Sequence, residues 1–320
     1  MEMEFYGSKY RVFKAALHTH STVSEDGILT PAQLIDLYRA KGYDVLAFTD
    51  HRFTNPVETY DGRGLVLIPG MEIHPERKYR GEYWHLLTLG LPKGFPLRFT
   101  HNQEAVDAVR KAGGLVFVPH PYWTGYSAER LAALHGVSGT EVYNGATREI
   151  GKDYNMESWD TFLDMGRNYT ALAVDDVHHR HDLFRGWTMI CAEEKTLPAI
   201  MEALRLGRFY ASRGPEFRRL SLKNGIFEAE FTPCVTAQLL ANGRRSYQGV
   251  FDNREVGEPP VFVEKISIDV SKLPVGRYLR CQITDGEGRM AWSNPIRRVS
   301  AARNGFKLCA GDEELQTIRE

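Results

Sequence analysis

The chain has 320 residues, of which 42% are hydrophobic and 25% charged, and its formal net charge is −1. This is the composition of an ordinary globular protein, and the length predicts either one large domain or a large domain with a smaller one. The near-zero charge argues against a protein that binds long nucleic acid, and no apolar run is long enough to cross a membrane.

The N-terminus, Met1-Glu2-Met3-Glu4, is acidic and lacks the pattern of a signal peptide, so we expect a cytoplasmic protein. From residue 15 to residue 208, short apolar runs alternate with amphipathic segments, which is typical of repeated βα units. Strands are predicted at 15–17, 44–48, 65–68, 85–89, 115–118, 140–143 and 171–174. Helices are predicted after the N-cap Thr30 up to Gly42, and at 103–112, 128–134 and 197–206. These elements predict a closed or nearly closed parallel barrel.

The pattern changes after residues 212–215. Strand-like stretches at 226–231, 265–270, 278–284 and 291–296 are separated by turn clusters such as Asn242-Gly243 and Asp285-Gly286. We therefore predict an α/β barrel domain at 1–213 and a small antiparallel β-sandwich domain at 214–320. The four cysteines are far apart in the sequence, and most of them stand in apolar runs, so we interpret them as buried thiols.

Histidine and carboxylate residues cluster at the ends of the predicted strands. They are His18 and His20, Asp50 and His51, Glu72, His85, His120, and Asp176 and His178. Two residues apart on an extended chain, His18 and His20 point to the same face. In a parallel barrel this face opens at the carboxyl ends of the strands, where such enzymes build their active sites.

Each of these residues alone could be structural, since a single His-x-His pair often just closes a strand. Six strand ends that all carry ligand-type residues would, however, form a crowd of buried charges that is costly without a cation. Imidazole and carboxylate ligands together suit zinc, manganese or iron better than calcium or magnesium. The pattern therefore predicts a site for several metal ions.

Six motifs, read in order, resemble those of the PHP (polymerase and histidinol phosphatase) family. They are His18-Thr19-His20, Ser24-Glu25-Asp26-Gly27, Thr49-Asp50-His51, Pro69-Gly70-Met71-Glu72, His120-Pro121 and Asp175-Asp176-Val177-His178. The resemblance covers about residues 15 to 180. It implies a distorted (β/α)7 barrel, a metal-dependent phosphoesterase activity and two or three divalent ions of zinc, manganese or iron.

The resemblance also implies which residues bind each ion. One metal would take His18, His20, Glu72 and Asp176. A second would share Glu72 and take His85 and His120, and a third would take Asp26, His51 and His178. Asp26 stands where some members of the family have histidine, a change that could alter the metal preference. His74, two residues after Glu72, could support a ligand or be an outer ligand itself.

Clustered metals lower the pKa of water and neutralise charge on a leaving oxygen, so no serine or cysteine nucleophile is needed, and no Gly-x-Ser-x-Gly motif is present. Asp50 and His178 are candidates for assisting proton transfer, although metal binding or support of a ligand explains them equally well. Arginines suit a phosphate group. The candidates are Arg148, Arg185 and Arg213, of which Arg185 is preferred as a catalytic or substrate-binding residue because its loop follows the Asp176 motif directly.

The leading hypothesis is thus a metal-dependent phosphoesterase that acts on a small phosphomonoester, a nucleotide phosphate or a short oligonucleotide end. The alternative is a metal-dependent hydrolase of carboxylic esters or carbamates, for which Tyr122, Trp123 and Tyr126 could form an aromatic pocket. A metal-stabilised binding protein is the third reading, and the open, nearly complete ligand set counts against it because structural metal sites are usually closed.

Overall fold

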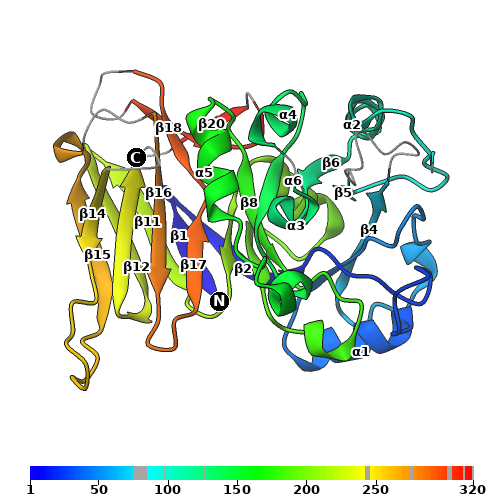
Figure 1. Cartoon of the computed structure of the whole chain (residues 1–320), viewed down its shortest axis with the longest axis horizontal. Coiled ribbons are helices and arrows are strands. Elements are labelled where there is room, and N and C mark those ends of the chain that lie inside the picture. Colours follow the sequence, from blue (N-terminus) through cyan, green and yellow to red (C-terminus); the bar gives the residue numbers. More distant parts are fainter. Residues whose placement is uncertain are drawn as a thin grey trace.

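The structure is a computed structural model that describes residues 1–74, 85–96, 98–125, 127–241, 246–273, 277–300, 305–312 and 314–318. Figure 1 shows strands of the second half, among them β12, β14 and β15, gathered at one end of the molecule. Strands β4, β5 and β6 lie toward the other end, and the N-terminal strands β1 and β2 lie between the two groups (Figure 1).

The first 213 residues contain ten of the strands and six helices within the described ranges. The strands are β1 (Glu2–Phe5), β2 (Ser8–Ala16), β3 (Val45–Phe48), β4 (Val66–Ile73), β5 (Leu86–Leu89), β6 (Leu115–Val118), β7 (Gly139–Asn144), β8 (Thr170–Val174), β9 (Trp187–Ala192) and β10 (Phe209–Ser212). The helices are α1 (Pro31–Ala40), α2 (Asn102–Lys111), α3 (Pro121–Thr124), α4 (Ala128–Ala132), α5 (Met156–Asp164) and α6 (Leu197–Arg205). Short 3₁₀ helices are η1 (Val57–Thr59), η2 (Ala146–Ile150) and η3 (Arg180–Asp182).

The remaining residues form mainly strands. These are β11 (Phe217–Lys223), β12 (Ile226–Cys234), β13 (Thr236–Ala241), β14 (Ser246–Val250), β15 (Val263–Asp269), β16 (Tyr278–Thr284), β17 (Met290–Ser293), β18 (Ile296–Arg298), β19 (Phe306–Cys309) and β20 (Leu315–Thr317). The 3₁₀ helix η4 (Val270–Lys272) follows β15.

Helix α1 begins as the sequence predicts. The Thr30 side chain accepts from the backbone N–H of Gln33, and the Gln33 side chain accepts from the N–H of Thr30, which completes a capping box. Pro31 takes the first helical position, where its missing N–H costs nothing. Leu34, Ile35 and Tyr38 are buried on one face of this helix, which fixes the long loop between β2 and the helix against the sheet.

A curled sheet positions the site. β2, β3 and β4 pair in parallel, as do β6, β7 and β8. Between these two sets, β5 is antiparallel to both β4 and β6, and on the other side β9 is antiparallel to β2. The α/β class is confirmed, but the prediction of a parallel barrel is wrong at β5, because a buried apolar run reads the same in either direction. The antiparallel strand β9 was not predicted at all.

The C-terminal strands are antiparallel, and they share ladders and core with the first half of the chain. β1 pairs in parallel with β11, and β10 pairs with β17. One apolar cluster joins Met3, Phe5 and Tyr210 to Phe227 and Ile283. A β-rich C-terminal part was expected; a sandwich that begins at residue 214 stays a prediction.

Two further expectations concern cysteines and membrane segments. All four cysteines are buried free thiols, as predicted. None of the helices in the described ranges has both the length and the apolar character that crossing a lipid bilayer requires.

A buried ion pair connects the two parts of the chain. Arg280 on β16 is 2% exposed, and its Nε and Nη2 atoms each lie 2.7 Å from a carboxylate oxygen of Asp160 on α5. Its guanidinium also lies over the ring of the buried Trp159. We predict that Arg280→Ala lowers the free energy of unfolding by about 3 kcal/mol, because it leaves the Asp160 carboxylate without its ion-pair partner, with only the Tyr278 hydroxyl still donating to it.

Urea denaturation measures this effect. The exposed pair Arg218–Glu264 provides the control, since Arg218→Ala should cost less than about 1 kcal/mol. Equal effects of the two variants would contradict the proposed coupling through Arg280.

Candidate metal centre

The predicted ligands converge at one edge of the curled sheet. His18 and His20 follow β2, His51 follows β3, His120 follows β6, and Asp176 and His178 follow β8. Glu72 is the second-last residue of β4, and its backbone N–H donates to the carbonyl oxygen of Thr49. His85 precedes β5, and because this strand is antiparallel, its first end lies at the same edge.

The first group consists of His18, His20, Glu72 and Asp176, as predicted, and all four residues are buried. The Nε2 atoms of the two histidines are 3.1 Å apart. Both approach Asp176 Oδ1, at 3.1 and 3.2 Å, and Glu72 Oε2, at 3.5 and 3.3 Å. Four ligand atoms therefore surround one point.

The second group shares Glu72. Its other oxygen, Oε1, lies 2.6 Å from His85 Nδ1 and 3.1 Å from His120 Nε2. The two oxygens of one carboxylate thus face two different groups of imidazoles, which is the arrangement of a ligand that bridges two metals.

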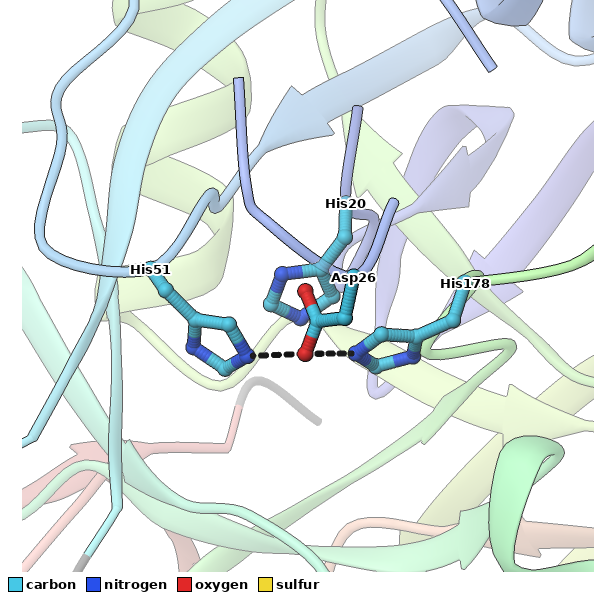
Figure 2. Close-up of side chains that lie close together, drawn as sticks. All are labelled: His20, Asp26, His51 and His178. Atoms are coloured by element: carbon cyan, nitrogen blue, oxygen red, sulfur yellow. Dashed lines mark ion pairs between the residues drawn. The ribbon is translucent and has the colours of Figure 1, made fainter. Parts of the chain in front are cut away.

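The third group brings Asp26 together with His51 and His178, and His20 lies beside them. Figure 2 shows the Asp26 carboxylate between the two imidazoles, with Oδ2 at 3.2 Å from His51 Nε2 and 3.6 Å from His178 Nε2. All nine predicted metal ligands therefore lie in three adjoining groups.

Histidine 74 lies next to the third group. Its Nε2 is 2.6 Å from His51 Nδ1, and its ring stacks on that of His85 with centroids 3.8 Å apart. Burial lowers the pKa of His74 to about 3, with the positive character of His85 adding to the effect, so the ring is neutral. These contacts fit a residue that orients His51.

A carboxylate that the sequence analysis missed orients two ligands. Glu141, inside β7, accepts from His18 Nδ1 at 2.7 Å with one oxygen and from the backbone N–H of His120 at 2.7 Å with the other. The first bond places the ring proton of His18 on Nδ1, which leaves Nε2 free to bind a metal. Its position inside an apolar strand gave no sequence signal for this role.

Asp50 was a candidate for proton transfer, but its contacts favour support of the ligand loop. Both carboxylate oxygens accept hydrogen bonds, from the backbone and hydroxyl groups of Ser21 and Ser24 and from the Asn55 side chain. Ser24 Oγ in turn lies 3.1 Å from His20 Nδ1. Asp50 thereby fixes the loop that carries His20 and Asp26.

The donor set fits a divalent metal. Asp176 Oδ1 is buried and receives no well-formed hydrogen bond from any described residue, although two imidazole nitrogens point at it. The backbone is also constrained here, because His120 and Asp176 have φ of 28° and 54°, values that side chains other than glycine rarely adopt. A buried carboxylate oxygen held in this position is suited to bind a cation.

The charges of the first group shift the pKa of its histidines. For His20, burial lowers the pKa, but the nearby Asp176 and Glu72 carboxylates outweigh burial and raise it to about 9. For His18, the Asp176 and Glu141 carboxylates likewise outweigh burial, and the pKa lies well above its ordinary value. Burial lowers the pKa of His85 and of His178, which favours the neutral form of these two imidazoles.

A cavity of about 440 Å³ opens over the three groups. The residues around it are Asp26, His51, Glu72, His74, His85, His120, Trp123, Ala146, Thr147, Glu149, Ile150, Asp176 and His178. The predicted catalytic residue His178 is thus at the cavity. Its Nδ1 donates to the carbonyl oxygen of Asp176 at 2.9 Å, which directs Nε2 toward Asp26.

The three predicted arginines are not among the residues that the structure places around this cavity. Arg148 interacts with Glu149 and the carbonyl oxygen of Gly145. Arg185 donates to the carbonyl oxygen of His181, and Arg213 lies over the rings of Tyr143 and Tyr154. Of the predicted aromatic residues, Trp123 contacts the cavity, whereas Tyr126 lies outside the described residues.

Residues 16–114 match the PHP domain family. The predicted resemblance to this family is therefore confirmed. The match includes six of the nine predicted ligands: His18, His20, Asp26, His51, Glu72 and His85.

Two relatives match shorter stretches. Over 153 residues, the chain is 29% identical to an uncharacterized protein of Methanocaldococcus jannaschii, with 42% of this chain and 84% of the relative covered. Over 124 residues, it is 32% identical to a 5'-3' exoribonuclease of Haemophilus influenzae, with 34% of this chain and 43% of the relative covered. The chain thus spans less than half the length of the exoribonuclease.

Among solved structures, a two-domain protein from Bacteroides vulgatus, described as containing a predicted PHP-like metal-dependent phosphoesterase, has a similar fold. The TM-score is 0.51 at 20% sequence identity, and the superposition covers 86% of this chain and 91% of that one. The similarity in fold therefore extends over most of both chains.

The Glu141 contact yields a prediction about metal affinity. We expect Glu141→Gln to weaken metal binding by about 10- to 100-fold, because a neutral amide oxygen holds the proton of His18 on Nδ1 less strongly than a carboxylate does. Competition with a chelator, followed by measurement of bound metal, tests this. Glu157→Gln, at an exposed position of α5, is the control; equal metal retention in both variants would contradict the role of Glu141.

The raised pKa of His20 predicts proton release on metal binding. Below pH 9 the metal-free protein holds a proton on this ring, which a metal must displace, so affinity should fall by at least about tenfold for each pH unit lowered between 9 and 7. Calorimetric titration with Mn²⁺ in buffers of different ionisation enthalpy counts the released protons. An affinity that does not change over this range would contradict the prediction.

Proposed function

We propose that the chain is a metal-dependent phosphoesterase that hydrolyses a small phosphate ester. The observation that carries this proposal is the Glu72 carboxylate, whose two oxygens face two separate groups of ligands beneath an open cavity. The PHP domain match supports a hydrolase of ester bonds. We further propose zinc, manganese or iron as the metal, at two or three positions.

When bound, the metals supply Lewis acidity that activates water and neutralises charge on the phosphate. The protein residues position these ions and limit what enters. Glu72, His18 and His120 are held rigidly by β-strand ladders and by Glu141, whereas Asp26 and His178 line the open side of the cavity. His178 remains our candidate for proton transfer, because its tautomer is fixed and its second nitrogen faces the cavity.

The proposed substrate is small. The cavity of about 440 Å³ falls within the range of pockets for small molecules, about 300–1,000 Å³. The net charge of −1 gives little attraction for a long nucleic acid. Because one relative is named an exoribonuclease, a short 5'-phosphorylated RNA belongs among the substrates to be tested.

A carboxylic ester or carbamate is the second candidate. It is favoured by one observation: no lysine or arginine is found among the described residues around the cavity, so a neutral substrate would lose no contact with a cationic side chain.

We predict that the protein, stripped of metal and then supplied with Mn²⁺ or Zn²⁺, releases phosphate from 4-nitrophenyl phosphate. His20→Ala removes a ligand that the first group needs, and we expect at least a hundredfold loss of kcat/KM together with a loss of bound metal. The matched control is His135→Ala, at an exposed histidine outside the cavity, which should keep full activity.

Two results would count against phosphate ester hydrolysis. The first is metal-loaded protein that cleaves 4-nitrophenyl acetate but not the phosphate, which would favour the second candidate. The other is a His20→Ala variant that keeps both its metal and its activity.

A further inference from the structure

Part of the lining of the cavity does not belong to the three metal groups and includes apolar side chains. Besides the residues of the three metal groups, the cavity is lined by Trp123, Ala146, Thr147, Glu149 and Ile150. Nothing in the metal arrangement requires these five side chains. Their chemistry therefore bears on the part of the substrate that is not the phosphate.

Trp123 is held beside the second metal group. It belongs to α3, the one-turn helix that begins directly after His120, and its backbone N–H donates to the carbonyl oxygen of His120 at 3.0 Å. Its ring centroid lies 5.0 Å from that of His120 and 5.5 Å from that of His85. The side chain is nevertheless 39% exposed, so part of the indole faces the cavity.

Ile150 belongs to the neighbouring loop. It ends η2, which follows β7, and β7 pairs in parallel with the strand that precedes α3. Its side chain is 60% exposed although it borders a concave site. Exposed apolar groups in a pocket beside a few polar groups are typical of surfaces that contact a ligand.

The charges of the residues around the cavity disfavour a second anionic group on the substrate. Within the described part of the chain, the cavity has no lysine or arginine, and the carboxylates of Asp26 and Glu149 border it. Three divalent ions would outweigh the carboxylates of Asp26, Glu72 and Asp176 and attract one phosphate group. A second anionic group, away from the metals, would meet Glu149 and an apolar wall.

We propose that the substrate is a phosphate monoester of an aromatic or similarly flat apolar alcohol that carries no second anionic group, and that Trp123 and Ile150 bind this alcohol. The inference rests on the proposed phosphoesterase function. In the reaction, the bond from phosphorus to the alcohol oxygen breaks and a bond from phosphorus to a water oxygen forms. One proton of the water ends on the alcohol, and inorganic phosphate is released.

Three alkyl phosphates with similar leaving groups test the inference on the metal-loaded protein: benzyl phosphate, ethyl phosphate and 4-carboxybenzyl phosphate. We expect kcat/KM for benzyl phosphate to exceed the values for the other two by about tenfold. Trp123→Ala should lower kcat/KM for benzyl phosphate about tenfold, mainly by raising KM, and change that for ethyl phosphate less than about twofold.

Ile150→Ala is the second variant, because Ile150 is exposed and belongs to none of the metal-ligand groups. It should lower kcat/KM for benzyl phosphate about threefold. Phe262→Ala and Met165→Ala, at exposed apolar residues outside the cavity, are the matched controls and should leave all three substrates unaffected. Bound metal is measured in every variant, so that a loss of metal is not mistaken for a loss of substrate binding.

The outcomes separate the two proposals. If wild-type protein cleaves all three esters equally well, or if Trp123→Ala and Ile150→Ala lower activity toward benzyl and ethyl phosphate alike, the inference about the alcohol is overturned while the phosphoesterase stands. If the metal-loaded protein releases phosphate from none of these esters or from 4-nitrophenyl phosphate, both proposals fail.

Discussion

One buried carboxylate organises the site. Among the described residues, six histidines place a ring nitrogen within 4.0 Å of Glu72, and the single negative charge cannot hydrogen bond with all of them. Its pKa is well below the ordinary value, since the surrounding histidines, His85 and His18 foremost, outweigh the burial that would raise it. Such an arrangement is costly unless cations occupy the space between the nitrogens and the oxygens. The strands on both sides of β4 hold the carboxylate there, so the sheet and the metal centre depend on each other.

The reversed direction of β5 serves this arrangement. In a parallel strand, only residues at the carboxyl end reach the site, but His85 precedes β5 and still lies at the same edge because β5 is antiparallel to β4. Glu72 and His85 are thereby placed on neighbouring strands, with 2.6 Å between Oε1 and Nδ1. The reversed strand thus places His85 in the second group. If β5 were parallel to its neighbours, the residue before it would lie at the opposite edge of the sheet.

Most ligands could be predicted from the sequence because they lie close to the end or start of an apolar run, and all of them, Asp26 included, because their motifs resemble those of the PHP family. Other features left no such local signal. Glu141 lies inside a strand, 123 residues from its partner His18, so only the folded structure shows the contact. Helix α5 was missed although Trp159, Phe162 and Leu163 have helical spacing, and strand β9 was missed as well. The predicted direction of β5 was wrong, because an apolar run does not show whether the neighbouring strands are parallel or antiparallel to it.

The C-terminal strands act on the site through the strands that carry its ligands rather than through the cavity. The Asn294 side chain accepts from the backbone N–H of Ala171 on β8, and donates to the carbonyl oxygens of Gly207 and Phe209. Arg280 binds Asp160 on α5, the helix between β7, which carries Glu141, and β8, which leads to Asp176. None of the residues described around the cavity comes from beyond residue 178. A residue with positive φ, such as Asp176, keeps its conformation only when its surroundings fix it. We therefore propose that this packing sets how firmly metals bind, and that the loops after β6 and β7 select the substrate.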